Sequence, residues 1–200
     1  MAGSLQCLFL HFFSRRYAAL TGERKLHLFE GIQGSILEIG AGTGVNLAFI
    51  PAGVRWTGVD PNPRSLPYIR EAARRSGHEF EFRQASAESL PFPDASFDSV
   101  ASTLTLCSVR DPGLALDEIR RVLRPGGQLL FMEHVAAAAG SRLRRRQRLL
   151  RPIFRCLVGC TPDRDTGSLL RAARFSTVEM EEFELSLPIV GPHICGRAVR

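Results

Sequence analysis

The sequence predicts an α/β fold, in which a mostly parallel sheet of seven strands is covered by helices on both faces. From residue 35 onward, short apolar runs alternate with segments of helical periodicity, which is the pattern of successive βαβ units. Three glycines at alternate positions, Gly40, Gly42 and Gly44, separate the first apolar run from the next helix, as in tight strand-to-helix turns that approach a ligand closely. The length of 200 residues is ordinary for a single domain, and one is predicted over residues 1–200.

Residues 1–32 have an amphipathic pattern and are predicted to form two helices that break near Thr21 and Gly22. The apolar run at residues 5–13 is about half the length of a membrane span and has no basic residue before it, so we do not expect a signal peptide. Residues 35–39 form the first strand, a helix begins over residues 45–50, and residues 55–59 form the second strand.

A Pro-Asn-Pro sequence introduces a helix over residues 64–76, and strands follow at residues 79–84, where apolar residues alternate, and at residues 96–102. Asp111 is the predicted N-cap of the next helix, which has proline at its first position and ends at Pro125-Gly126-Gly127. The predicted apolar face of this helix comprises Leu114, Leu116, Ile119, Val122 and Leu123.

Residues 128–133 form the fifth strand and are nearly all apolar, which is typical of a central strand covered on both faces. A basic helix over residues 141–158, a short helix over residues 166–174 and strands at residues 177–185 and 193–199 complete the chain.

Charge and cysteine content narrow the class of protein. The formal net charge is +6, and Lys25 is the single lysine among 26 basic residues. Arginines cover one side of the basic helix and leucines the other. This arrangement favours a solvated face above a core-facing stripe, and contact with an anionic membrane surface is the alternative. Nucleic acid is not expected, because no aromatic residues stand between these arginines. Five scattered cysteines are typical of a reduced, cytoplasmic protein, and no metal site is predicted.

Acidic residues around the glycines point to a particular ligand. Glu38 stands two positions before Gly40, and Asp60 follows at the end of the second strand, where a carboxylate can accept hydrogen bonds from two ribose hydroxyls. Dinucleotide sites carry their third glycine where this chain has Val45. The pattern closely resembles that of class I S-adenosylmethionine-dependent methyltransferases, and the resemblance implies their Rossmann-like fold and S-adenosylmethionine as the cofactor.

The same resemblance extends to other segments. Residues 85–94 are similar to the loop that frames the adenine in these enzymes, with Ser86 where an aspartate is common and Ala87 as a wall. The fourth strand would end at the transferred methyl group. The resemblance therefore implies a cofactor site composed of Glu38, Gly40, Ala41, Gly42, Gly44, Asp60, Pro61, Ser86, Ala87, Thr103 and Leu104.

Several motifs resemble those of the thiol S-methyltransferases of the methyltransferase-like group, from about residue 34 to the end of the chain. They are the stretches at residues 103–109, 122–127, 131–135, 159–160, 175–176 and 192–196. The implied reaction is an in-line displacement by a thiolate on a small-molecule acceptor. The membrane anchor of vertebrate members is not expected to carry over, and residues 1–32 would instead form a lid.

An apolar acceptor pocket is expected at the end of the fourth strand, lined by Leu106 and Cys107, with Tyr17 of the lid as a further contact. His134 and His193 are the candidate bases, because both stand where strand ends face the site and histidine titrates near neutrality. Methylation of a lipid-like acceptor, such as a quinone precursor or a phospholipid head group, is the alternative activity, and a cofactor-binding regulator without activity is the alternative outside the enzymes. The oligomeric state is not predicted.

Overall fold

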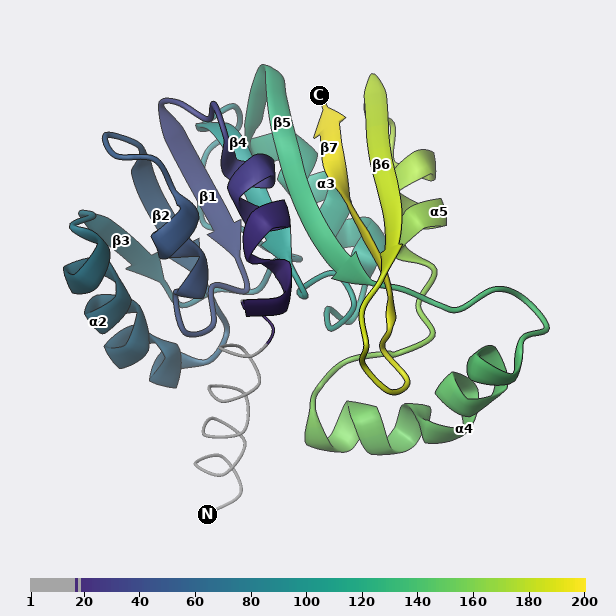
Figure 1. Ribbon diagram of the computed structural model, residues 1–200. Coiled ribbons are helices and arrows are strands. Elements are labelled where there is room, and N and C mark those ends of the chain that lie inside the picture. The colour runs from purple at the N-terminus through teal and green to yellow at the C-terminus, as the bar shows by residue number, and fades with distance from the viewer. Residues whose placement is uncertain (1–16, 18) are drawn as a thin grey trace.

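A computed structural model describes residue 17 and residues 19–200, so the apolar run at residues 5–13 lies outside the described residues. Within them, seven strands form one sheet with the order β3-β2-β1-β4-β5-β7-β6 (Figure 1). β7 alone runs antiparallel to its two neighbours. The predicted mostly parallel seven-stranded α/β fold is therefore confirmed. The strands are β1 (Ser35–Ile39), β2 (Arg55–Val59), β3 (Phe80–Arg83), β4 (Phe97–Thr103), β5 (Leu123–His134), β6 (Thr177–Glu184) and β7 (Pro192–Val199).

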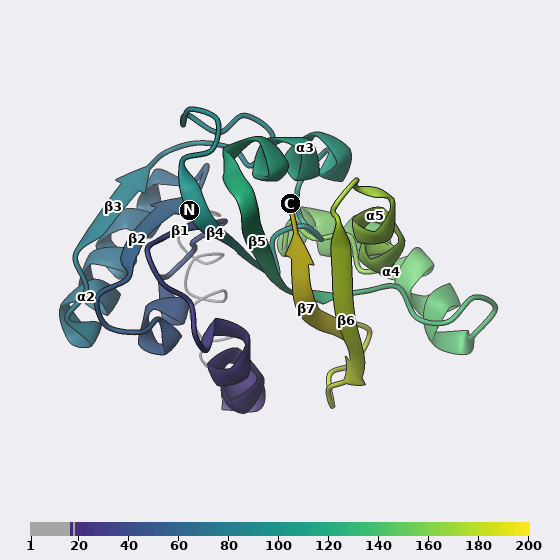
Figure 2. The same ribbon diagram turned by 90° about the horizontal axis from the view of Figure 1, so that it is seen from above.

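Helices cover both faces of the sheet, as predicted (Figure 2). α3 and α5 lie on one face, and α2 and the N-terminal helix, described at residue 17 and residues 19–29, lie on the other. Among the described residues, we find no helix long and apolar enough to cross a membrane. The remaining helical elements are η1 (Val45–Phe49), η2 (Pro63–Ser65), α2 (Leu66–Ser76), α3 (Pro112–Val122), α4 (Arg142–Leu157) and α5 (Thr166–Ala172).

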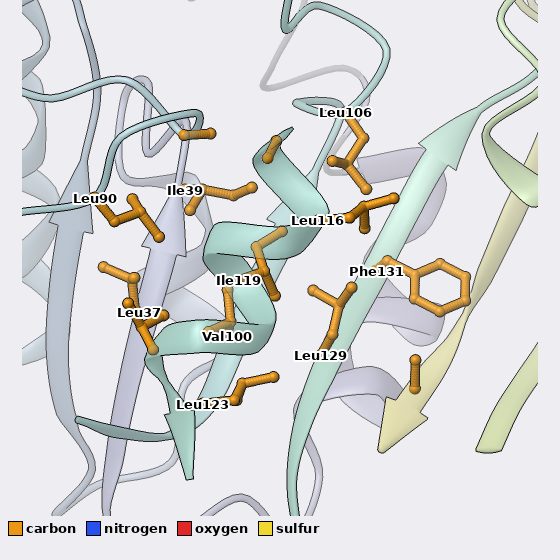
Figure 3. Close-up of a cluster of buried hydrophobic side chains, with 14 of the residues drawn as sticks. Leu37, Ile39, Leu90, Val100, Leu106, Leu116, Ile119, Leu123, Leu129 and Phe131 are labelled. Carbon is orange, nitrogen blue, oxygen red and sulfur yellow. The ribbon is translucent and has the colours of Figure 1, made fainter. Parts of the chain in front are cut away.

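Side chains of the central strands contribute to two hydrophobic clusters, one on each face of the sheet. Leu37 of β1 is buried against α3, where Leu116 and Ile119 are directed toward the sheet (Figure 3). The next residue back, Ile36, belongs to the opposite cluster together with Phe29 of the N-terminal helix. Successive side chains of a strand point to opposite faces, so one parallel strand can contribute to both clusters.

The predicted break in the N-terminal helix is wrong, because the helix continues through Thr21 and Gly22. The Thr21 hydroxyl donates to the carbonyl oxygen of Tyr17 at 2.8 Å, one turn earlier. A local hydrogen bond of this kind satisfies the threonine without interrupting the helix. The continuous helix places Lys25 and Phe29 against the sheet, and both side chains are buried.

α3 ends earlier than predicted, and its buried face differs. Leu123 already pairs with Phe97 of β4, and the ladder resumes at Gln128 with Ser99, so the residues between them form a bulge that accommodates Pro125. Leu114, predicted to lie in the core, is exposed, while the neighbouring Ala115 is buried against the sheet.

α4 forms at the predicted position, but the expected core-facing stripe is not buried. Leu149, Ile153 and Leu157 are 78%, 52% and 63% exposed, and Gln147 is the buried residue of the helix. The Gln147 side chain accepts from the Ala137 amide and donates to the Ile189 carbonyl, so polar bonds attach the helix to the body. Figure 1 shows α4 beyond the end of the sheet toward which the β1 and β5 arrows point.

Candidate functional site

A pocket of about 910 Å³ lies at the carboxyl ends of β1, β2 and β4, the edge of a parallel sheet where ligands bind in folds of this type. The N-terminal helix contributes Tyr17 and Lys25 to its wall. The predicted cofactor residues that line the pocket are Glu38, Gly40, Ala41, Gly42, Asp60, Pro61, Ser86, Ala87, Thr103 and Leu104.

The glycine turn after β1 is held in left-handed backbone conformations that favour glycine. Gly40 has φ +60°, and a Cβ atom there would lie 2.3 Å from Oγ1 of Thr105, whose hydroxyl donates to the Ile39 carbonyl. Gly44 lies outside the pocket: it has φ +70° at the start of η1, and a Cβ atom would lie 3.2 Å from Cα of Ile69 in α2. The structure therefore places Gly40 in the ligand turn and Gly44 in helix packing.

Asp60 at the end of β2 is both a structural and a candidate binding residue. Its carboxylate accepts from the Gly42 amide at 2.9 Å and from the Asn62 amide at 2.8 Å, which connects the glycine turn to the β2 end. Each carboxylate oxygen has two lone pairs, so acceptor capacity remains for hydroxyl groups of a ligand. This geometry suits a ribose.

Glu38 belongs to a buried polar network on the pocket wall. The indole of Trp56 donates to one carboxylate oxygen at 2.9 Å, and the amide of Asn46 donates to the other at 2.8 Å. Burial raises the pKa of Glu38 to about 7, against the opposing effect of these hydrogen bonds and of the positive charge on Lys25. Asn46 also donates to Oγ1 of Thr103 at 2.7 Å, so the network joins the ends of β1 and β4.

Lys25 completes this network and was not among the predicted site residues. Its ammonium donates to Oδ1 of Asn46 at 2.7 Å, and its side chain is 1% exposed. Burial lowers the pKa of Lys25 to about 8, and the negative charge of Glu38 opposes part of this decrease. One signal in the sequence could have identified it, because a single lysine among so many arginines stands out.

The predicted adenine loop is organised by Glu88. The Ser86 hydroxyl donates to the Glu88 carboxylate, and the amide of Arg110 donates to the same carboxylate at 2.8 Å. Glu88 therefore joins this loop to the turn before α3. Because the Ser86 hydroxyl proton is used here, Ser86 has only acceptor capacity left for a ligand.

Two residues predicted to line the acceptor pocket, Leu106 and Cys107, are not among its lining residues. Leu106 is buried against α3 (Figure 3), and Cys107 is buried behind the pocket wall, where burial raises the pKa of its thiol well above the ordinary range. Glu133 holds this segment of the backbone in place: its buried carboxylate accepts from the amides of Leu106 and Cys107 at 3.0 and 3.2 Å, and from that of Thr105 at 3.0 Å. The expectation that Leu106 and Cys107 line the pocket is therefore wrong.

The apolar part of the pocket comes from other residues. Leu104, Val109 and Leu114 line it together with Tyr68 of α2 and Val158 at the end of α4. Sequence periodicity assigned Leu114 to the core and gave no signal for Tyr68. The exposure of Leu114 is explained by its position at the pocket rim.

The two candidate bases lie outside the pocket-lining residues. Burial lowers the pKa of His134 to about 3, and neither of its ring nitrogens has a hydrogen-bond partner among the described residues. His193 places Nδ1 2.7 Å from the Gly191 carbonyl, and its ring lies 5.5 Å from that of Tyr17, which does line the pocket. Both imidazoles therefore stand behind the wall, and this placement does not support proton transfer from a bound acceptor to either ring.

These features fit the cofactor that the sequence motifs imply. The close approach at Gly40 would let a ligand reach the backbone, Asp60 offers acceptors for a ribose, and Glu38 offers an anion for a ligand ammonium. The chemistry of this donor set matches S-adenosylmethionine better than a phosphate-containing cofactor, since a buried carboxylate would repel phosphate. The described residues contain no group of side chains suited to a metal ion.

Comparisons with known proteins agree with this geometry. The family described as "Methyltransferase domain" matches residues 37–131. The thiol S-methyltransferase TMT1B of Homo sapiens is 40% identical over 88% of this chain and 78% of that protein, and TMT1A of the same organism is 37% identical over 96% and 84%. Among solved structures, an S-adenosylmethionine-dependent methyltransferase from Methanosarcina mazei superposes with a TM-score of 0.67 at 26% identity, covering 88% of this chain and 96% of that one.

Proposed function

The chain belongs to the thiol S-methyltransferase family, within the class I S-adenosylmethionine-dependent methyltransferases, and on that premise we propose that it methylates the sulfur of a small-molecule thiol. The observation that carries the proposal is the similarity to these enzymes along nearly the whole chain. The pocket supports it, because cofactor-type polar residues and an apolar acceptor side meet in one cavity. An apolar lining suits a soft, weakly hydrated nucleophile.

The chain's own residues position the reactants. S-adenosylmethionine, when bound, supplies a methyl group on a sulfonium that a thiolate can displace in line. Asp60 would hold the ribose and Glu38 the amino group, while Leu104 at the end of β4 borders the acceptor side. Glu133 fixes the turn after Leu104 through three backbone amides, so the acceptor side is held in one geometry. Orientation of this kind supplies a large part of the acceleration in a displacement reaction.

We further propose that the acceptor enters as a thiolate formed in solution. The two histidines stand behind the pocket wall, so the acceptor thiol, with an ordinary pKa near about 8.5, would lose its proton to water. The pH dependence of kcat/KM should then follow the pKa of each acceptor thiol. A series of thiols with graded pKa values tests this; a single inflection that stays at one pH for every thiol would instead indicate a base on the protein.

The acceptor class is tested by turnover with labelled cofactor. Alkyl thiols, demethylquinones and amino lipids are offered separately, and product is separated by chromatography. Turnover of thiols is expected. Cofactor binding without turnover of any thiol would contradict the proposal, and turnover confined to the quinone or the amino lipid would establish the lipid-like alternative.

The surface of α4 supports a second proposal, peripheral contact with an anionic membrane surface. The helix carries seven arginines and no acidic residue, and Leu149, Ile153 and Leu157 are exposed beside them. Apolar side chains next to clustered positive charge are typical of helices that lie in a lipid interface. Because Val158 follows α4 and lines the pocket, this contact would bring the pocket near the membrane, where lipophilic thiols partition.

Sedimentation with phosphatidylserine-containing and neutral vesicles tests this contact. We expect binding to the anionic vesicles that falls as salt is raised, and loss of binding in Leu149→Asp. Leu26→Asp, at an exposed leucine of the N-terminal helix, is the matched control. Equal binding of wild type and Leu149→Asp would contradict the assignment.

A further inference from the structure

Lys25 is a buried cation with unused hydrogen-bonding capacity on the pocket wall. A lysine ammonium has three donors, and among the described residues its hydrogen bond is the one to Asn46. Two aromatic rings offset part of the cost of burial by cation–π attraction, with Nζ 5.5 Å from the Tyr17 ring centroid and 5.6 Å from that of Phe49, but neither ring accepts the remaining N–H groups in a conventional hydrogen bond. Burying a charge with so few partners is costly, so a lysine kept in this position indicates a partner that arrives with the ligand.

Asn46 keeps the two charges of this wall apart. Its carbonyl oxygen accepts from Lys25, and its amide nitrogen donates to Glu38, so the cation and the anion are bridged and make no direct ion pair. The pocket wall therefore carries a positive group, Lys25, and a negative group, Glu38, which are separated by the side-chain amide of Asn46. A zwitterionic amino acid group carries the complementary pair, a carboxylate and an ammonium.

Resting on the proposed function, we propose that Lys25 binds the carboxylate of the cofactor's amino acid end, while Glu38 binds its ammonium. The N-terminal helix then acts as a cofactor-binding element, since Lys25 is the residue through which it reaches the charged part of the pocket. Binding would supply the missing partner for the buried ammonium and complete the network of Lys25, Asn46 and Glu38.

A purely structural role makes a different prediction. If Lys25 served only to balance the charge of Glu38, its loss would weaken every ligand of the pocket to a similar degree. If it binds the carboxylate, its loss weakens only ligands that have one. Decarboxylated S-adenosylmethionine keeps the sulfonium, the ribose, the adenine and the amine, and lacks the carboxylate alone, so it separates the two roles.

Titration calorimetry with both ligands tests the proposal. We expect the wild type to bind S-adenosylmethionine about 10- to 100-fold more tightly than the decarboxylated analogue, as for a hydrogen bond between charged groups. Lys25→Met should remove this preference by weakening S-adenosylmethionine alone. Lys25→Gln, which keeps a donor for Asn46, should behave in the same way and guards against a folding defect of the methionine variant, as checked by thermal unfolding.

Arg24→Met is the matched control, because Arg24 precedes Lys25 on the same helix but pairs with Glu181 at the surface, outside the pocket. Its preference between the two ligands should equal that of the wild type. An equal affinity of the wild type for both ligands, or a preference that survives in both Lys25 variants, would overturn the proposal and leave the proposed function intact. A wild type that binds neither ligand would overturn the proposed function itself.

Discussion

The ionisation of His134 gives a quantitative test of the electrostatics behind the pocket. Burial is the main cause that lowers its pKa from 6.5 to about 3, and the nearby charges of His193 and Arg164 lower it further. Between these two pH values, the unfolded chain binds a proton at this position and the folded chain does not. The free energy of unfolding therefore rises with pH across this window.

The magnitude follows from the two pKa values. At about 1.4 kcal/mol per pH unit, the whole difference amounts to about 5 kcal/mol, and at pH 5 the folded state has lost about 2 kcal/mol of it. Glu38 acts in the opposite direction, because its raised pKa makes the folded state bind a proton more readily than the unfolded chain. A comparison of two proteins that both contain Glu38 removes this contribution.

Urea denaturation of wild type and His134→Phe between pH 5 and 8 provides that comparison. We expect the difference in unfolding free energy between the two proteins to shift by about 2 kcal/mol in favour of the variant as the pH falls to 5. His27→Phe, at an exposed histidine, should follow the wild type. Parallel profiles for wild type and His134→Phe would refute the reasoning and restore His134 as a group that can be charged near neutrality.

Three further predictions concern Asp60, Gly40 and Glu133. Asp60→Asn should weaken cofactor binding by about 1–3 kcal/mol in calorimetry, because an amide cannot accept all the bonds of the carboxylate; unchanged affinity in the folded variant would contradict the ribose assignment. Gly40→Ala should destabilise the chain in urea by more than about 2 kcal/mol, from left-handed strain plus overlap with Thr105, whereas Gly53→Ala has the strain alone and should cost about 1–2 kcal/mol. Equal costs would remove the role of the close approach. Glu133→Gln should lower the unfolding free energy by about 1–3 kcal/mol, because the amide nitrogen that replaces one carboxylate oxygen cannot accept from a buried backbone N–H, and an unchanged midpoint would argue against that anchor.

Local patterns identified the sheet and the polar half of the site. The strands β1 and β2 are short runs with clear ends, and Glu38, Gly40 and Asp60 stand at or next to those ends, so their positions follow from the strand boundaries. Lys25 was not predicted as a site residue because it lies on the N-terminal helix, which packs against strands that are distant in the sequence. Hydrophobic periodicity does not show which polar residue of such a helix becomes buried.

The apolar half was less predictable for a related reason. Leu106 and Leu114 are both leucines near α3, and the sequence assigned the first to the pocket and the second to the core, the reverse of what the structure shows. The deciding contact is the long-range one to Glu133, which turns the Leu106 segment inward. α4 was misassigned because amphipathic periodicity reports that a face is apolar and does not report that protein covers it.

The sheet order explains why these groups meet. β1 lies between β2 and β4, and the chain leaves β1 toward the face covered by α2 and the N-terminal helix, but leaves β4 toward the face covered by α3 (Figure 2). Connections that diverge to opposite faces open a crevice between the two strand ends. At its base, Gly40 and Thr105 approach each other so closely that no side chain fits at Gly40. The cavity and the requirement for glycine at position 40 thus have the same origin. A larger residue at this position would displace both the turn after β1 and the turn after β4 that contains Thr105.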